Sequence, residues 1–423
     1  MNKHSWLALV LGVTFALLVP LQAHAEKQTL SAEEQAVADK HKDRKAQALS
    51  ERVGKKVQKA FDAYSANDIK GAITILNEVK PDKDYDKAYV ARFLGNMYAL
   101  NEQNGKAIKA LEEAVGIDQL SAVEHAQTLR LLGDMQLQEK QYAKAIKAYD
   151  QWQAFTGKEE AALYVRKAQA YYELKRYGDM IAPLDRAIAL SPKPDKNAYI
   201  LKLSSYYERK DYRNSVKVLE RLVSLFPDDK RWWSQLGMFY MMIEDYKKAL
   251  STLDGAYLAG LLTKENEIKA LAQLYATNGI PYKSAALQDK YMKSGLLKRD
   301  AKSIAALANT WHAAKELDKA AGLYLEAAGM SGDADLYRKA GNIQMQAEQY
   351  ADAAKSFGKA LEKGVSSPER VYLALAESYL NRKKYSDAFR YVKKAEQYPK
   401  TEKTARSWAV YIQDQAKRHG QSL

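Results

Sequence analysis

Residues 230–256 read KRWWSQLGMFYMMIEDYKKALSTLDGA and hold two tryptophans and three methionines within little more than three helical turns. A hydrophobic ligand pocket and a groove for a partner helix could both produce such a cluster, and so could a packing pattern that recurs along the chain. Six residues carry its spacing, which is W-x2-L-G-x2-Y followed by Y-x2-A: Trp233, Leu236, Gly237, Tyr240, Tyr246 and Ala249. Whether the spacing recurs decides between the explanations.

The same spacing recurs along most of the chain. Equivalent points fall near residues 53, 88, 126, 161, 196, 230, 266, 301, 334 and 369, so the period is close to 34 residues. The small residue Gly237 has glycine counterparts at Gly95, Gly133 and Gly341. The cluster at 230–256 is therefore a packing pattern first, and its recurring residues are predicted to be core.

A period near 34 with this signature resembles the tetratricopeptide repeat family. The resemblance covers residues 53–400 and implies an all-α, right-handed superhelical solenoid of about ten helix-turn-helix repeats. Glycine or alanine lets the two helices of a repeat approach closely, and no repeat can close its own core, so neighbours must stack. Residues 401–423 are predicted to form the capping helix and tail that such an array needs.

The first 25 residues have the features of a cleaved signal peptide. Lys3 precedes an apolar run from Trp6 to Val19, and residues 23–25 form an A-x-A cleavage signal. The run is short for a membrane span, and no later segment reaches 18 uninterrupted apolar residues. We therefore expect a periplasmic protein without a membrane span after cleavage.

Residues 26–52 are highly charged and link the signal peptide to the repeats. Ser31 and Glu34 have capping-box spacing, so a helix is expected to begin there. Apolar residues before Leu49 are too sparse to bury a helix face. The segment is predicted to be an exposed helical arm or a mobile linker.

The sequence contains no sign of catalysis. Cysteine is absent, which excludes thiol chemistry and cysteine-ligated metals, and the histidines after the signal peptide lack metal-ligand spacing. We expect no enzyme activity, no catalytic residue, no metal and no cofactor. The formal net charge of +14 attracts anionic partners, but the aromatic residues occupy repeat core positions and export argues against nucleic acid.

Some domains of this family clamp a carboxylate with a basic residue and an asparagine one helical turn later, and the resemblance implies a similar inner face here. Two pairs have that spacing, Arg92 with Asn96 and Arg338 with Asn342, and Asn309 and Arg370 could join the second pair from adjacent repeats. A complete clamp set does not occur in any three consecutive repeats. The alternative is that these residues only solvate an exposed face.

The central repeat adds three candidates that the packing pattern does not require: Trp232, Met238 and Met241. Met238 and Met241 are spaced to point toward the inner face, and methionine-rich surfaces adapt to varied partners. The alternative is that these side chains fill gaps in the core.

The resemblance to this family implies a non-enzymatic adaptor that binds proteins, as a monomer or weak oligomer. The overall plan is similar to the periplasmic tetratricopeptide repeat proteins that accompany TonB-type energy-transduction systems of gamma-proteobacteria. That implies an accessory role in TonB–ExbB–ExbD iron uptake, with a component of this machinery as partner. The alternative is an adaptor for peptidoglycan, exopolysaccharide or lipopolysaccharide machinery, which the positive charge favours.

Overall fold

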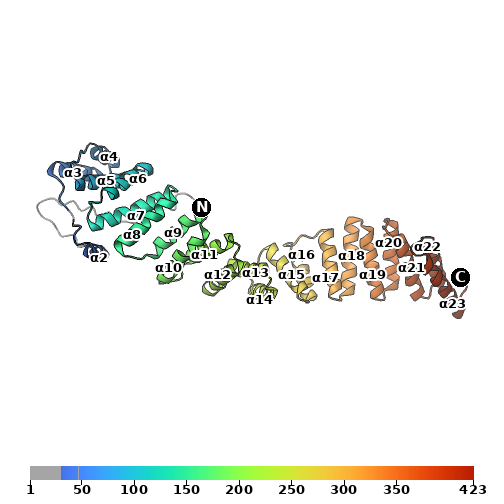
Figure 1. The fold of residues 1–423 in the computed structure, drawn as a ribbon. Coiled ribbons are helices and arrows are strands. Elements are labelled where there is room, and N and C mark those ends of the chain that lie inside the picture. The colour runs from blue at the N-terminus through green and yellow to red at the C-terminus, as the bar shows by residue number, and fades with distance from the viewer. Residues whose placement is uncertain (1–29, 46) are drawn as a thin grey trace. The chain divides into compact units, whose positions relative to one another are not determined.

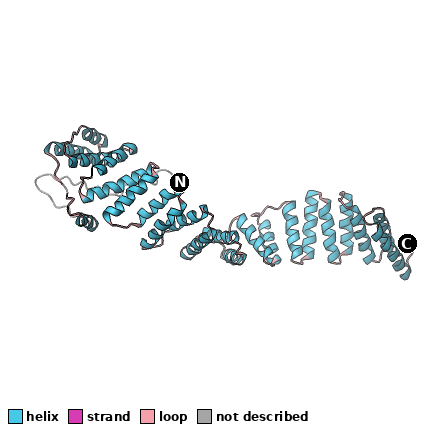
Figure 2. Cartoon of the chain, in the orientation of Figure 1, coloured by secondary structure: helices cyan, strands magenta, loops and turns pink. Residues whose placement is uncertain are grey.

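The structure, a computed structural model, describes residues 30–45 and 47–423. The predicted signal peptide at residues 1–25 lies outside the described residues. Within them every regular element is a helix and no strand occurs (Figure 2). The all-α prediction is therefore confirmed for this part of the chain.

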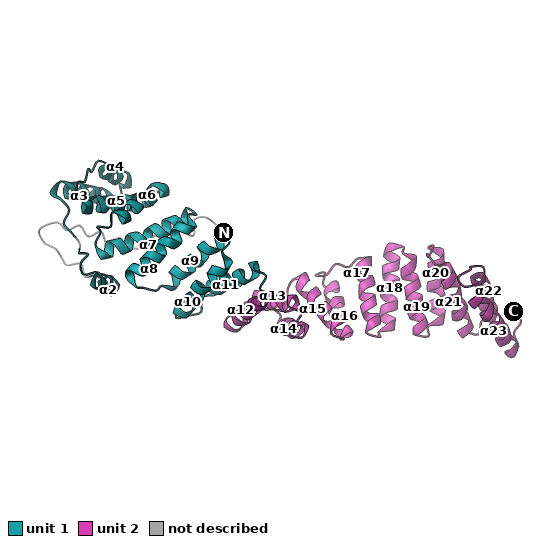
Figure 3. Cartoon of the chain, viewed as in Figure 1, with its two compact units in different colours: residues 1–211 teal, residues 212–423 magenta. Residues whose placement is uncertain are grey.

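The chain divides into two compact units, residues 1–211 and 212–423 (Figure 3). Unit 1 contains α2 (Ala32–Lys40), α3 (Glu51–Ser65), α4 (Ile69–Asn77), α5 (Asp84–Leu100), α6 (Asn104–Ile117), α7 (Ala122–Gln138), α8 (Tyr142–Thr156), α9 (Ala161–Glu173), the 3-10 turn η2 (Tyr177–Met180), α10 (Ile181–Leu190) and α11 (Lys196–Glu208). Within it, α3 to α10 form four antiparallel pairs (Figure 1).

Unit 2 begins with α12 (Tyr212–Leu225) and continues with α13 (Lys230–Met242), α14 (Tyr246–Leu258), α15 (Glu265–Thr277), α16 (Pro281–Lys293), α17 (Ala301–Ala313), α18 (Leu317–Ser331), α19 (Ala334–Gln346), α20 (Tyr350–Glu362), α21 (Pro368–Asn381), α22 (Tyr385–Glu396) and α23 (Glu402–Arg418). In element order, the helices from α3 to α22 correspond to the ten predicted repeats.

The turn inside each repeat has one conformation throughout the array. The residue seven positions after the small-residue position, which Leu203 fills in the fifth repeat, has a positive φ in all ten repeats. The next backbone N–H bonds back to a carbonyl five residues earlier, as from Asp245 to Tyr240 at 2.9 Å. The ten positive-φ residues are Asn67, Glu102, Lys140, Lys175, Lys210, Glu244, Gly279, Lys315, Glu348 and Lys383. Glycine occurs at only one of them, so the pattern of glycines in the sequence did not reveal these turns.

The small residue of the first helix faces a large side chain of the second helix in the same repeat. A Cβ atom at Gly341 would lie 2.6 Å from Phe357, and one at Gly133 would lie 2.6 Å from Tyr149. Gly95 and Gly237 meet leucines in the same way. These glycines therefore set how closely paired helices approach.

The central repeat follows this plan with two exceptions. Leu236, Gly237, Tyr240 and Ala249 are buried as expected. Tyr246, predicted to be core, is 48% exposed because it is the first residue of α14 and lies at the turn.

The two adjacent tryptophans exchange the roles expected of them. Trp232, predicted to be available to a partner, is only 4% exposed, and the guanidinium of Arg231 lies 5.0 Å from its ring centroid. Trp233, predicted to be core, is partly exposed and donates its indole N–H to the carbonyl oxygen of Pro227 at 2.8 Å. The sequence spacing identified position 233 as the recurring one. The rotation of α13 about its axis, however, places Trp232 rather than Trp233 in the core.

The last helix, α23, packs against α22 and closes the array at its C-terminal end. It buries Ala405, Ala409, Ile412 and Ala416 against the last repeat. Its other face is mainly polar, with Val410 and Tyr411 exposed. This arrangement is what a terminal helix of a repeat array requires.

We predict that Gly341→Ala destabilises unit 2 by about 1–3 kcal/mol, because the new methyl group must displace the Phe357 ring. Gly358→Ala is the matched control, since Gly358 lies inside α20 with open space around its Cα and alanine favours the helix by up to about 1 kcal/mol. Urea titration followed by circular dichroism measures both. If the Gly358→Ala protein unfolds at a lower urea concentration than the Gly341→Ala protein, the proposed contact between Gly341 and Phe357 does not limit helix packing.

Candidate partner-binding surfaces

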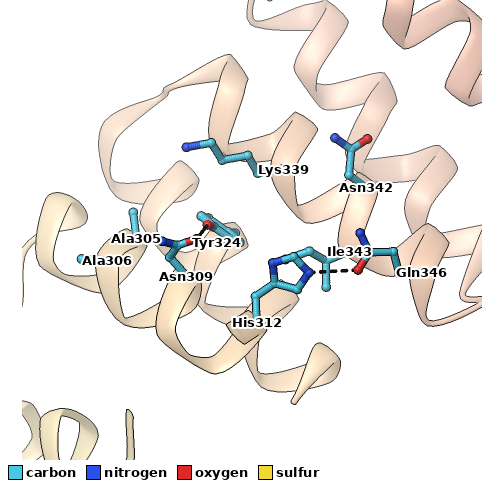
Figure 4. Close-up of a pocket in the computed structure, with 9 residues that line it drawn as sticks. All are labelled: Ala305, Ala306, Asn309, His312, Tyr324, Lys339, Asn342, Ile343 and Gln346. Carbon is cyan, nitrogen blue, oxygen red and sulfur yellow. Dashed lines mark hydrogen bonds between the residues drawn. The ribbon is translucent and has the colours of Figure 1, made fainter. Parts of the chain in front are cut away.

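Unit 2 contains a hollow of about 490 Å³ between α17 and α19 (Figure 4). Both are first helices of their repeats, and Tyr324 of α18 contributes to the wall. Its polar lining includes residues from adjacent repeats: Asn309, His312, Tyr324, Lys339, Asn342 and Gln346. Successive first helices therefore present their exposed polar side chains to a shared surface.

The wall of the hollow is held by contacts between its own side chains. The Tyr324 hydroxyl donates to Asn309 Oδ1 at 3.5 Å, and His312 Nε2 donates to Gln346 Oε1 at 2.9 Å. Burial raises the pKa of Tyr324, so its hydroxyl stays protonated and remains a donor at neutral pH. Because Asn309 accepts through its oxygen, its NH2 group is left to face a ligand.

Two hydrogen-bond donors of the hollow have no partner among the described residues. Within residues 30–45 and 47–423, neither the Lys339 ammonium nor the Asn342 side-chain amide has a hydrogen-bond or ion-pair partner. The Lys339 ammonium lies 5.8 Å from the centroid of the Tyr324 ring. One ammonium and two amide NH2 groups line this hollow, and they are donors of the kind that the acceptor oxygens of a carboxylate require.

The structure brings together only part of the predicted set. Asn309 and Asn342 line the hollow, but Arg338 points its Nε at Asp335 Oδ1 at 2.8 Å within α19. Arg370 lies exposed at the start of α21 and does not line the hollow. Lys339 supplies the basic group instead, and its spacing of three residues before Asn342 was the signal that sequence reasoning missed.

The other predicted pair, Arg92 and Asn96, is not an open anion site. Both side chains are buried in unit 1, with 7% and 3% exposed. Arg92 donates to Gln127 Oε1 at 2.8 Å and lies 3.4 Å from a carboxylate oxygen of Glu124. The adjacent helix α7 thus already neutralises the arginine, and the expectation of an exposed clamp here was wrong.

The methionines of α13 lie on an accessible part of unit 2. Met238 and Met241 are partly exposed and Met242 is 46% exposed. Their role in partner binding stays a prediction.

Residues 30–45, here called the strap, pack against other helices of unit 1. The helix α2 begins with the expected capping box, in which the Glu34 N–H donates to Ser31 Oγ and the Ser31 N–H donates to Glu34. Val37 is buried against α7 residues that include Ala122 and Ala126. The segment was expected to be an exposed helical arm or a mobile linker; α2 is helical, and Val37 is its buried residue.

A cluster of ring and charged side chains anchors the end of the strap. His41 stacks on Phe155 with ring centroids 4.0 Å apart and donates Nε2–H to the Phe155 carbonyl oxygen at 2.8 Å. Arg44 donates to the Leu120 carbonyl oxygen at 3.1 Å and to Asp118 at 2.8 Å. These contacts fix the strap to the loop before α7 and to the last turn of α8.

The strap is held weakly compared with a repeat. Burial of a valine side chain contributes about 1.5–3 kcal/mol, and a nine-residue helix is not stable alone in water. Helix α2 therefore depends on docking for its helical structure, and local opening of the strap costs far less than unfolding a repeat.

His125 of α7 lies under the strap in an environment that disfavours its charged form. Arg44 approaches Nδ1 at 3.4 Å, and the ring lies 4.8 Å from the Phe155 ring. Burial, followed by the charge of Arg44, lowers the pKa of His125 to about 4, and the nearby Asp118 offsets this only in part. The docked strap thus favours the neutral form of His125.

Neither a metal centre nor a membrane span is found in the described part of the chain. No group of three or more His, Asp or Glu side chains there is placed to hold a metal ion. No helix there combines the length and the apolar character needed to cross a bilayer.

Comparison with protein families gives a direct assignment. Residues 101–159, 201–260 and 338–401 match one tetratricopeptide repeat family description, and residues 161–194 match a second. Together these segments make up just over half of the chain. The chain is a member of the tetratricopeptide repeat family, as the spacing predicted, and proteins of this family act as scaffolds for protein–protein interaction.

Several solved structures are similar to parts of this chain at low identity. A tetratricopeptide repeat protein from Parabacteroides merdae matches 62% of this chain and 99% of its own, at 13% identity and a TM-score of 0.35. MamA from Desulfovibrio magneticus matches 41% of this chain and 94% of its own, at 19% identity and a TM-score of 0.33. YrrB, described as having an unusual peptide-binding site, matches 40% and 84%, at 17% identity and a TM-score of 0.33. No curated protein matches the chain significantly.

We predict that strap docking weakens in acid. The ordinary pKa of a histidine is near 6.5, and the docked state lowers that of His125 to about 4. Docking is therefore at full strength above about pH 6.5 and is lost as the pH falls toward about 4, by up to about tenfold per pH unit. Hydrogen exchange of the α2 amides, corrected for intrinsic rates, measures the effect.

The variant His125→Gln should flatten this dependence, and His312→Gln in unit 2 should leave it unchanged. Equal protection of α2 at pH 7 and pH 4.5 in the unmodified protein would contradict the assignment.

Proposed function

We propose that the protein is a non-enzymatic scaffold that binds an extended peptide segment of a partner protein in the hollow between α17 and α19. The observation that carries the proposal is the set of open donors there, the Lys339 ammonium with the side-chain NH2 groups of Asn309 and Asn342. The ligand group is a carboxylate, either an acidic side chain or a chain terminus. A lysine ion pair and amide hydrogen bonds would fix its position.

The hollow suits a carboxylate on a flexible peptide better than a small-molecule substrate. It is open between two helices, and polar groups of both α17 and α19 reach it (Figure 4). The lysine and amides offer positive charge and hydrogen-bond donors, but the lining holds no acidic residue that could act as a general acid or base with His312. This chemistry supports binding and gives no support to catalysis.

The partner that we propose is a component of the bacterial envelope. The signal-like start of the sequence supports export to the periplasm, and the plan of charged arm followed directly by repeats supports an accessory role in a TonB–ExbB–ExbD iron-uptake system. The second candidate is an adaptor for peptidoglycan, exopolysaccharide or lipopolysaccharide machinery. The net charge of +14, carried mostly by residues 212–423, favours that candidate.

The test is photocrosslinking in cells with a photoreactive amino acid at position 306, an exposed residue that lines the hollow. We expect one major crosslinked partner, and we expect Lys339→Glu to reduce its capture about tenfold or more, because a charge-assisted hydrogen bond is worth about 1.5–3 kcal/mol. The matched control is Lys363→Glu, which makes the same charge change at an exposed site in unit 2 outside the hollow.

If the Lys339→Glu and Lys363→Glu proteins crosslink the partner equally well, the hollow is not the binding site. The identity of the captured protein separates the two candidate functions, since a TonB, ExbB or ExbD component supports the first and a polysaccharide or peptidoglycan factor supports the second.

A further inference from the structure

The strap shows what kind of segment the surface beneath it accepts. Its helix presents two acidic residues in the first turn and a single apolar side chain one turn later. Glu33 pairs with Lys158 at 3.4 Å, and Glu34 accepts a hydrogen bond from Gln127 at 2.9 Å. Val37 then enters the apolar surface. The surface thus accepts a helix that begins with acidic residues and carries one small apolar residue.

The receiving surface belongs to helices that pair without the strap. It consists of Ala122 and Ala126 at the start of α7 and neighbouring apolar side chains of α8 and α9, Trp152 and Leu163, and is here called the docking strip. The α7–α8 pair is closed by its own contact between Gly133 and Tyr149. Removal of the strap would uncover the docking strip and leave the repeats assembled.

The acidic start of the strap also connects to Arg92 of α5 through a hydrogen-bond chain. Gln127 joins Glu34 to Arg92, because its amide donates to Glu34 and its carbonyl oxygen accepts from Arg92 at 2.8 Å. Lys158, with 25% of its side chain exposed, is the cation that pairs directly with the acidic start of the helix.

We propose that the docking strip is a binding site for an amphipathic helix with an acidic first turn in a partner protein, and that α2 covers this site in cis when the partner is absent. The strap is suited to this role because only Val37 enters the apolar surface, so a partner helix with two apolar residues competes effectively. This site is separate from the hollow of unit 2 and does not rest on the function proposed for it.

The test uses the full-length protein with the strap dislodged by Val37→Asp. The probe is a fluorescent synthetic peptide with the sequence of residues 30–45, measured by fluorescence anisotropy at pH 7. We expect Val37→Asp to bind this peptide at least tenfold more tightly than the unmodified protein does. Ala36→Asp is the matched control, because Ala36 lies exposed on the same helix, and it should bind the peptide as weakly as the unmodified protein.

A second peptide, carrying Glu33→Lys and Glu34→Lys, should lose at least tenfold in affinity for the Val37→Asp protein. Equal binding of the first peptide to the Val37→Asp and Ala36→Asp proteins would overturn the proposal. So would crosslinking of the peptide outside residues 122–163, or a dimer of the unmodified protein that forms by exchange of straps, since a second copy would then be the natural occupant.

Discussion

The close approach of two helices at one small residue is the contact on which the structure depends. At Gly133 and Gly341 the first helix has no side chain, and an aromatic ring of the second helix occupies the space. Each repeat is thereby a closely packed pair of helices with two apolar faces. The helix pairs of the neighbouring repeats must cover these faces. The contacts within and between adjacent repeats stabilise the array. The exposed side chains of the first helices are therefore not needed for packing and can contact a partner.

The turn inside each repeat is the second constraint. A residue in the left-handed conformation ends every first helix and reverses the chain, although nine of the ten residues there are not glycine. Such a conformation costs a non-glycine residue about 1–2 kcal/mol, and the backbone hydrogen bond across the turn and the packing of the pair offset it. The repeated geometry keeps equivalent positions of successive first helices next to one another. That is how Asn309 and Asn342, one repeat apart, reach the same hollow.

Whether a basic side chain on the array can bind a partner depends on the repeat beside it. Arg92 occupies the position that Arg338 occupies in its repeat, and Lys339 lies one residue later. Glu124 and Gln127 of the next repeat engage Arg92, whereas no carboxylate reaches Lys339 among the described residues. The strap follows the same logic, since its Glu34 connects through Gln127 to Arg92. Arg92 of unit 1 is thus satisfied within the chain, and the hollow of unit 2 keeps its donors open.

The sequence by itself determined the repeat, its period and its small residues, because these follow from local spacing that every repeat must satisfy to stack. It also placed Asn309 and Asn342 on one face of their helices. It could not separate Trp232 from Trp233, or Arg338 from Lys339, because neighbouring residues differ only by a rotation about the helix axis that packing decides. Only the tertiary structure showed that Arg92 is neutralised and that Val37 docks the strap, because both depend on contacts between residues that are 32 to 93 positions apart in the chain.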